Sequence, residues 1–205
     1  FTLIEIAIVL VIIVLLLGGV LKGQELINSA KVKNLANDFK NTPVLLYGYQ
    51  DKFKAIPGDD AAVQSHVGTT ATLASNGTRN GVIEGAWNST NNGDESYLFW
   101  QHVSLAGLSS GGTTAPINAL GGKLGVTGSS PINMPGAFIV CSENIPGKLA
   151  MQLDSTLDND GDTSKGSMRA ITNTTAAALV YPASAVAVSV TPADEAILYT
   201  VCQGS

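Results

Sequence analysis

The chain has 205 residues, of which 45% are apolar and 13% charged, and its formal net charge is −5 at pH 7. This composition excludes a disordered acidic chain and is sufficient for one sizeable core. The charge is uneven, because residues 1–54 carry six lysines against four acids while the remainder is acidic. An acidic body repels phosphates, so no specific nucleic acid is expected as a partner.

The first expected element is an apolar helix over residues 1–21, FTLIEIAIVLVIIVLLLGGVL, in which only Thr2 and Glu5 are polar. The run is long enough to cross a bilayer. A secretory signal peptide does not fit, because the run lacks a basic region before it and a small-residue cleavage site after it. Since the chain starts with Phe1, we also expect that an upstream segment has been removed.

Glu5 is the most informative residue of this run. A carboxylate at hydrocarbon depth is costly and requires a partner. Its own amino group lies about one helical turn away, where pairing within a single chain is awkward. A neighbouring copy, shifted along the helix axis, would instead bring its Phe1 amine alongside Glu5. The alternative is a carboxyl group that snorkels or is protonated near one face of the membrane.

The start Phe1-Thr2-Leu3-Ile4-Glu5, followed by an apolar run, resembles the processed N-terminus of the type IV pilin family. The resemblance implies that a prepilin peptidase cleaves before Phe1 and that the new amine is methylated. It also implies that Glu5 pairs with the Phe1 amine of an adjacent subunit. The match is specific, although it covers only residues 1–21.

The sequence departs from this family near position 22, where many members carry a proline and this chain has Lys22. Gly18, Gly19 and Gly23 surround that position. Each glycine weakens a helix by roughly 1 kcal/mol relative to alanine. These glycines are therefore expected to supply a flexible or melted segment in place of the proline.

Residues 22–54 predict an amphipathic continuation of the same helix. Apolar side chains recur on one helical face, at Leu35, Phe39, Leu46, Tyr49 and Phe53. A kink is expected at the proline at position 43, and the segment 56–59, IPGD, is a strong stop. We therefore divide the chain into an N-terminal helix, 1–54, and a globular body, 55–205. Residues 1–21 form the membrane or filament-core half of the helix, and residues 22–54 form the stem.

The body predicts fewer regular elements. A short buried helix is expected at 97–108, and a long surface loop at 111–135. The last third predicts a strand at 136–141, a short helix after Pro146, and a hairpin of two β-rich runs, 183–190 and 196–202. Together these elements indicate an α+β fold, with a long helix packed on a small antiparallel sheet. The resemblance implies the same fold. Three blocks of the chain also look like those of a large-bodied subgroup of prepilin-type proteins, at residues 53–60, 95–108 and 153–170.

Cys141 and Cys202 are the two cysteines of the chain, and neither lies in a metal-binding pattern. In an exported protein the simplest expectation is one disulfide that closes residues 141–202. Two buried thiols are the alternative.

An acidic segment follows the expected helix after Pro146. Asp158, Asp160 and Asp162 alternate along the chain, and Asp154 precedes them by one helical turn. Calcium favours such oxygen-rich turns, although the spacing is not that of an EF-hand. The alternative is a solvated acidic turn that pairs with the nearby bases, Lys165 and Arg169. No cofactor other than this possible calcium is expected.

The sequence offers no catalytic pattern. The two histidines, His66 and His102, lack sequence neighbours that would suggest a triad or a metal site, and His102 is expected to be a packed core residue. We therefore do not expect an enzyme.

The leading interpretation is a major pilin, the structural subunit of an extracellular type IV pilus. Its expected partners are identical subunits, the prepilin peptidase and an inner-membrane assembly platform. It would reside in the bacterial inner membrane before it enters the surface filament. The alternative is a pseudopilin of a type II secretion machine. A third reading, a membrane-tethered binding protein or enzyme, is disfavoured by Glu5, because a simple anchor gains nothing from a buried acid.

Overall fold

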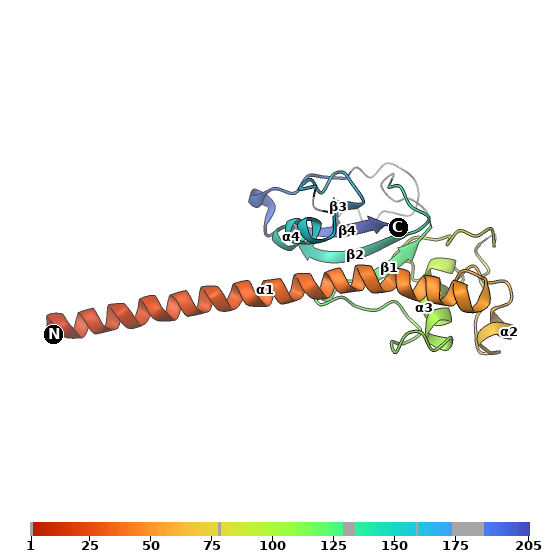
Figure 1. The fold of residues 1–205 in the computed structure, drawn as a ribbon, viewed down its shortest axis with the longest axis horizontal. Helices are drawn as coiled ribbons and strands as arrows, with labels where there is room; N and C mark the ends of the chain where they lie inside the picture. Colours follow the sequence, from red (N-terminus) through yellow and green to blue (C-terminus); the bar gives the residue numbers. More distant parts are fainter. Residues whose placement is uncertain (1, 78, 129–133, 159, 174–186) are drawn as a thin grey trace.

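The structure is a computed structural model that describes residues 2–77, 79–128, 134–158, 160–173 and 187–205. Its dominant element is helix α1, Leu3–Phe53, whose 51 residues correspond to a length of about 77 Å. The second half of α1 lies along the body, and the first half projects away from it (Figure 1). This arrangement confirms the expected long N-terminal helix.

Helix α1 continues through Pro43, so this proline does not end it. The Thr42 hydroxyl donates to the carbonyl of Asp38 at 2.8 Å, immediately before the proline. The helix ends where Lys54 adopts a left-handed conformation with φ 56°, directly before the stop that the sequence predicts. The three glycines of the apolar half also lie within this continuous helix.

The second half of α1 buries one face against the body, as its apolar periodicity predicts. Large and small side chains recur on this face at steps of three and four residues, the spacing of one helical face. The buried residues of α1 are Val32, Leu35, Ala36, Phe39, Thr42, Leu46 and Tyr49. None of the buried residues of α1 precedes Val32, so the body supports only the C-terminal part of this helix.

The body contains a four-stranded antiparallel sheet with the order β1-β2-β4-β3. Its strands are β1, Leu124–Thr127, β2, Ile139–Pro146, β3, Met168–Thr172, and β4, Leu198–Gly204. The helices of the body are α2, Val63–Val67, α3, Glu95–Leu105, and α4, Gly147–Leu157, with a short 3-10 helix, η1, at Pro192–Asp194. The α+β fold is thereby confirmed, as are the helices expected near residues 97–108 and after Pro146.

The two faces of the sheet carry separate cores, because successive strand residues point to opposite sides. Val140 and Val201 belong to the large core that includes the buried face of α1. Cys141 and Cys202, the next residues along the same strands, belong to a smaller core with Trp87. The sheet therefore lies between the stem helix and a loop-covered second core.

Two sequence-based expectations are wrong. Residues 187–191 are irregular and β4 pairs with β2 and β3, so β4 has no free edge for the expected hairpin partner. Residues 183–186 of that partner lie outside the described residues. The expected surface loop 111–135 contains the buried strand β1, which pairs with β2, although residues 129–133 also lie outside the description.

Candidate functional site

Among the described residues, the most exposed apolar surface is the first half of α1. Each large apolar side chain between Leu3 and Leu21 is 46–92% exposed. The helix is long and apolar enough to cross a membrane, by length and composition. Fully burying one such side chain is worth about 1.5–3 kcal/mol, so a surface of this size requires a cover.

Glu5 has a local role that the sequence analysis did not anticipate. The N–H of Thr2 donates to Glu5 Oε2 at 2.8 Å, and the N–H of Glu5 donates to Thr2 Oγ1 at 3.4 Å. These reciprocal bonds form a capping box at the start of α1. Phe1, the expected site of processing and methylation, lies outside the described residues. Thr2 followed three residues later by Glu5 was the sequence signal for this cap.

The expected disulfide joins Cys141 of β2 to Cys202 of β4. The two residues face each other in the register of these strands, with a Cα–Cα distance of 4.1 Å. The bond therefore links the two central strands of the sheet and closes residues 141–202, as expected. Both residues are fully buried.

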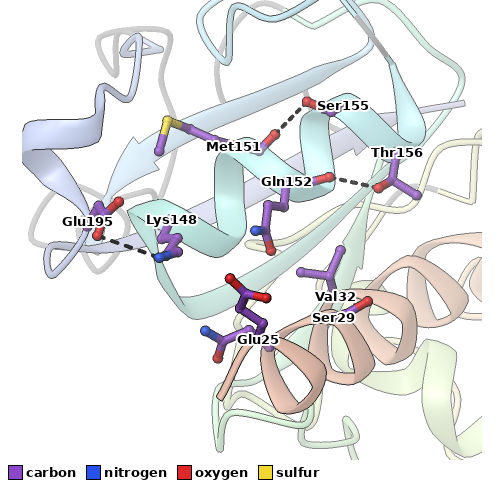
Figure 2. A pocket seen from close by; sticks show the side chains of 10 residues that line it. Glu25, Ser29, Val32, Lys148, Met151, Gln152, Ser155, Thr156 and Glu195 are labelled. Atoms are coloured by element: carbon purple, nitrogen blue, oxygen red, sulfur yellow. Dashed lines mark hydrogen bonds and ion pairs between the residues drawn. The ribbon is translucent and has the colours of Figure 1, made fainter. Parts of the chain in front are cut away.

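A groove lies between α1 and α4, close to the point where α1 leaves the body. Its volume is about 540 Å³. Figure 2 shows Glu25, Ser29 and Val32 of α1 on one wall and Lys148 and other residues of α4 on the opposite wall. Lys148 also pairs with Glu195 at 3.9 Å. The groove is lined mainly by polar side chains.

The structure brings together three of the four candidate calcium ligands. One carboxylate oxygen from each of Asp154, Asp158 and Asp160 lies within 4.8 Å of the other two. Asp154 belongs to α4, Asp158 is its C-terminal cap, and Asp160 lies in the following loop. Burial, followed by the charges of Asp160 and Asp158, raises the pKa of Asp154 to about 6.

Asp162, the fourth candidate, does not join this cluster. Its Oδ1 accepts hydrogen bonds from the hydroxyl and N–H of Ser164, and its Oδ2 lies 2.9 Å from Lys165 Nζ. The Ser164 hydroxyl and Lys165 hold the pKa of Asp162 well below its usual range. Asp162 therefore pairs with Lys165, as the alternative to calcium binding predicts for this residue.

A second carboxyl pair was missed by the sequence analysis. Asp59, in the loop after α1, and Glu95, at the start of α3, are buried and close enough for their charges to interact. Burial, followed by the charge of Asp59, raises the pKa of Glu95 to about 7, and burial also raises that of Asp59. The only sequence signal was an acid at the start of an apolar helix, which equally fits an exposed first turn.

The two histidines have structural partners in the same part of the body. His66 Nδ1 lies 2.7 Å from Asp60 Oδ2, which also accepts from the Tyr49 hydroxyl at 2.7 Å. His102 is fully buried, and its Nδ1 accepts from the Gly58 N–H at 2.9 Å. Burial lowers the pKa of His102, so it is neutral at pH 7. His102 is thus a core residue, as expected, and both histidines help to fix the loop after α1.

Comparisons with models of protein families, with curated proteins and with solved structures gave no match to this chain.

Proposed function

We propose that this chain is a structural subunit of an extracellular protein filament whose core is built from the first halves of many copies of α1. The observation that carries this proposal is the apolar surface between Leu3 and Leu21, which the chain's own body leaves exposed. Lipid covers such a helix in a membrane, and the helices of other copies cover it in a bundle. In this proposal the subunit is stored in a membrane, where lipid covers the helix, and is then assembled into a filament, where the helices of other copies cover it.

The particular filament that we propose is a type IV pilus, with this chain as its major pilin. The N-terminal start FTLIE, the long helix and the antiparallel sheet closed by a disulfide support this assignment together. In this proposal a prepilin peptidase releases Phe1 and an inner-membrane platform assembles identical subunits. The chain is then a structural protein rather than an enzyme.

Glu5 supports assembly more strongly than simple anchoring. Its capping bond to Thr2 satisfies part of its hydrogen-bonding capacity, but it leaves a full negative charge in an apolar stretch. In the proposed filament the Phe1 amine of a neighbouring copy neutralises that charge. A charge pair in a low-dielectric core is favourable only when both partners are present, so the pair also sets the register between neighbouring helices.

The direct test is to shear filaments from the surface of cells that express the chain and to identify their subunit by mass spectrometry. The expected result is long filaments, visible by electron microscopy, that consist mainly of this chain with a methylated Phe1. Cells that lack the gene should have no such filaments, and re-expression should restore them.

Two other outcomes would contradict the proposal. A chain confined to the cell envelope, whose loss blocks protein secretion, would support the pseudopilin alternative. A chain that stays monomeric in the membrane, shown by cross-linking in intact cells, would support a tethered binding protein or enzyme.

A further inference from the structure

The carboxylates at the end of α4 form a cluster with an unusual member. Asp154 is only 1% exposed, and its Oδ1 is buried without a hydrogen-bond donor from the described residues. A backbone N–H from Gly161 favours its charged form, but Oδ1 does not share that bond. A buried oxygen without a partner costs about 1–3 kcal/mol, and more when the group is charged. Among the described residues, no positively charged or proton-donating group therefore compensates Asp154 Oδ1.

The other two carboxylates are held in place by the backbone around them. Asp158 Oδ2 accepts from the N–H groups of Ser167 and Met168, at 2.6 and 3.0 Å. Asp160 Oδ1 accepts from the Asp162 N–H at 3.0 Å. The carboxylates of Asp158 and Asp160 both lie against Gly166, where a Cβ would collide with them. Backbone N–H groups of the loop thus orient both carboxylates.

We propose that Asp154, Asp158 and Asp160 bind one calcium ion. Calcium bonds to oxygen at 2.3–2.6 Å, so two oxygens that share one ion lie at most about 5 Å apart. The three carboxylate oxygens lie within 4.8 Å of one another, which fits this limit. Magnesium bonds at about 2.0–2.1 Å, requires a stricter octahedron and gives up its waters reluctantly, so we expect this cluster of carboxylates to prefer calcium. Calcium takes six to eight oxygens, so the three carboxylates do not complete its coordination. Water would supply the remaining oxygens from the side of Asp160, which is exposed.

The ion would join the end of α4 to the loop that leads into β3. Asp154 lies in the helix that packs on α1, whereas Asp158 bonds to the backbone at the start of β3. Neutralising the cluster would fix the end of α4 to the edge of the sheet. This role does not depend on the proposed filament, so the two proposals can fail separately.

The test uses the full chain in detergent micelles, first freed of metal with a chelator and then titrated with CaCl2 or MgCl2. Equilibrium dialysis should find one calcium ion per chain. The melting temperature should rise by several degrees with calcium, because a ligand that binds only the folded state stabilises it. Magnesium at the same concentration should produce a smaller rise.

Three variants separate this site from its surroundings. Asp154→Asn keeps the shape of the side chain but removes the charge, and should weaken calcium binding at least tenfold. Asp160→Asn should do the same from an exposed position, so the test survives if Asp154→Asn does not fold. Asp162→Asn is the matched control, since this residue is engaged with Ser164 and Lys165, and it should retain the wild-type response.

In calcium, Asp154→Asn should melt at a lower temperature than the wild type, and in chelator this difference should disappear or change sign. Without the ion, Asp154→Asn should melt at the same temperature as the wild type or higher, because it removes a buried like charge. The proposal is overturned if dialysis finds no bound calcium, or if the melting temperature is the same in calcium and chelator. It is also overturned if Arg169→Gln destabilises the chain equally in both conditions while calcium has no effect, because Arg169 would then neutralise the cluster.

Discussion

The carboxyl groups of Asp59 and Glu95 are buried together inside the body, close enough for the charge of Asp59 to raise the pKa of Glu95. One oxygen of each is occupied by a backbone donor, since Asp59 Oδ2 accepts from the Gly81 N–H at 2.7 Å and Glu95 Oε2 from the Glu84 N–H at 2.8 Å. The remaining oxygens, Oδ1 and Oε1, are buried without a hydrogen-bond donor among the described residues. Two buried like charges repel each other, so we expect the pair to hold one proton in the folded chain.

This pair predicts that the body loses stability as the pH rises. The pKa of Glu95 is raised from 4.5 to about 7 in the folded chain, so the folded state binds more protons than the unfolded state between these values. The resulting stabilisation is fully present below pH 4.5 and is lost as the pH rises through about 7, by on the order of 2–3 kcal/mol.

The measurement is urea unfolding of the wild type and Glu95→Gln between pH 4 and 8, at a fixed calcium concentration. Glutamine cannot ionise, and its amide can donate to Asp59 in place of that proton. The variant should therefore lose most of the pH dependence and be more stable than the wild type at pH 8. Parallel stability curves for the two proteins would rule out a proton held at this pair.

Glu5 has two separable roles, a cap within its own helix and a charge for a neighbouring subunit. Glu5→Ala removes both and should abolish or greatly reduce filaments. Glu5→Gln keeps the capping bond to Thr2, since glutamine also completes a capping box, but it leaves the neighbour's amine unpaired. Breaking a buried pair costs on the order of 3–5 kcal/mol, so Glu5→Gln should also reduce filament yield severely.

Thr2→Ala is the matched control, because it removes a cap worth about 1 kcal/mol and keeps the charge. It should retain most of the filaments. The measurement is the amount of sheared filament relative to the amount of chain in the membrane. Normal filament yield from Glu5→Gln would show that only the cap matters and that the proposed pair does not form.

The disulfide predicts a large effect of reduction. Cys141 and Cys202 are 61 residues apart, and closing a loop of that length stabilises the folded state by roughly 4 kcal/mol in the chain-entropy model. The double variant Cys141→Ala/Cys202→Ala should have a free energy of unfolding lower by about this amount. A reductant should lower the stability of the wild type similarly and leave the double variant unchanged. An unchanged wild type in reductant would contradict the prediction, provided that mass spectrometry confirms two free thiols.

The glycines of α1 predict where the helix changes on assembly. In the isolated chain α1 is continuous, and a Cβ at Gly18, Gly19 or Gly23 would meet no other atom within 4 Å. Replacing all three with alanine should therefore leave the isolated chain folded. In the filament, we expect a non-helical stretch to begin between Gly18 and Gly23, where neighbouring subunits can satisfy the freed backbone groups.

A filament map at side-chain resolution is the measurement for this prediction. The alanine variant should stay helical across the same span. Unbroken helical density there in the wild-type filament would indicate that the glycines serve close packing between helices instead.

Local patterns in the sequence predict much of the fold. The apolar run, the helical spacing from Leu35 to Tyr49 and the stop after Phe53 predicted α1 almost residue by residue. A helix carries its hydrogen bonds and its amphipathic period within one segment, so these signals are readable from the sequence. After Pro146, three leucines at steps of four residues, Leu149, Leu153 and Leu157, predict α4 for the same reason.

The strand partners could not be predicted in this way. A strand satisfies its backbone only by pairing with another segment, and the sequence does not state which segment that is. The run that leads to Val190 resembles a strand as much as β4 does, yet β4 takes β2 and β3 as neighbours. The short strand β1 also lacked a clear period, because its four residues are all buried.

The candidate sites follow the same division. The expectation that Cys141 and Cys202 pair needed only their number and an exported location, and the acidic turn was visible as alternating aspartates. Tertiary structure alone decided that Asp154 is buried while Asp162 turns to Lys165, and that Asp59 meets Glu95. Burial and proximity depend on segments far apart in the chain, and the free energy of a carboxylate depends on both.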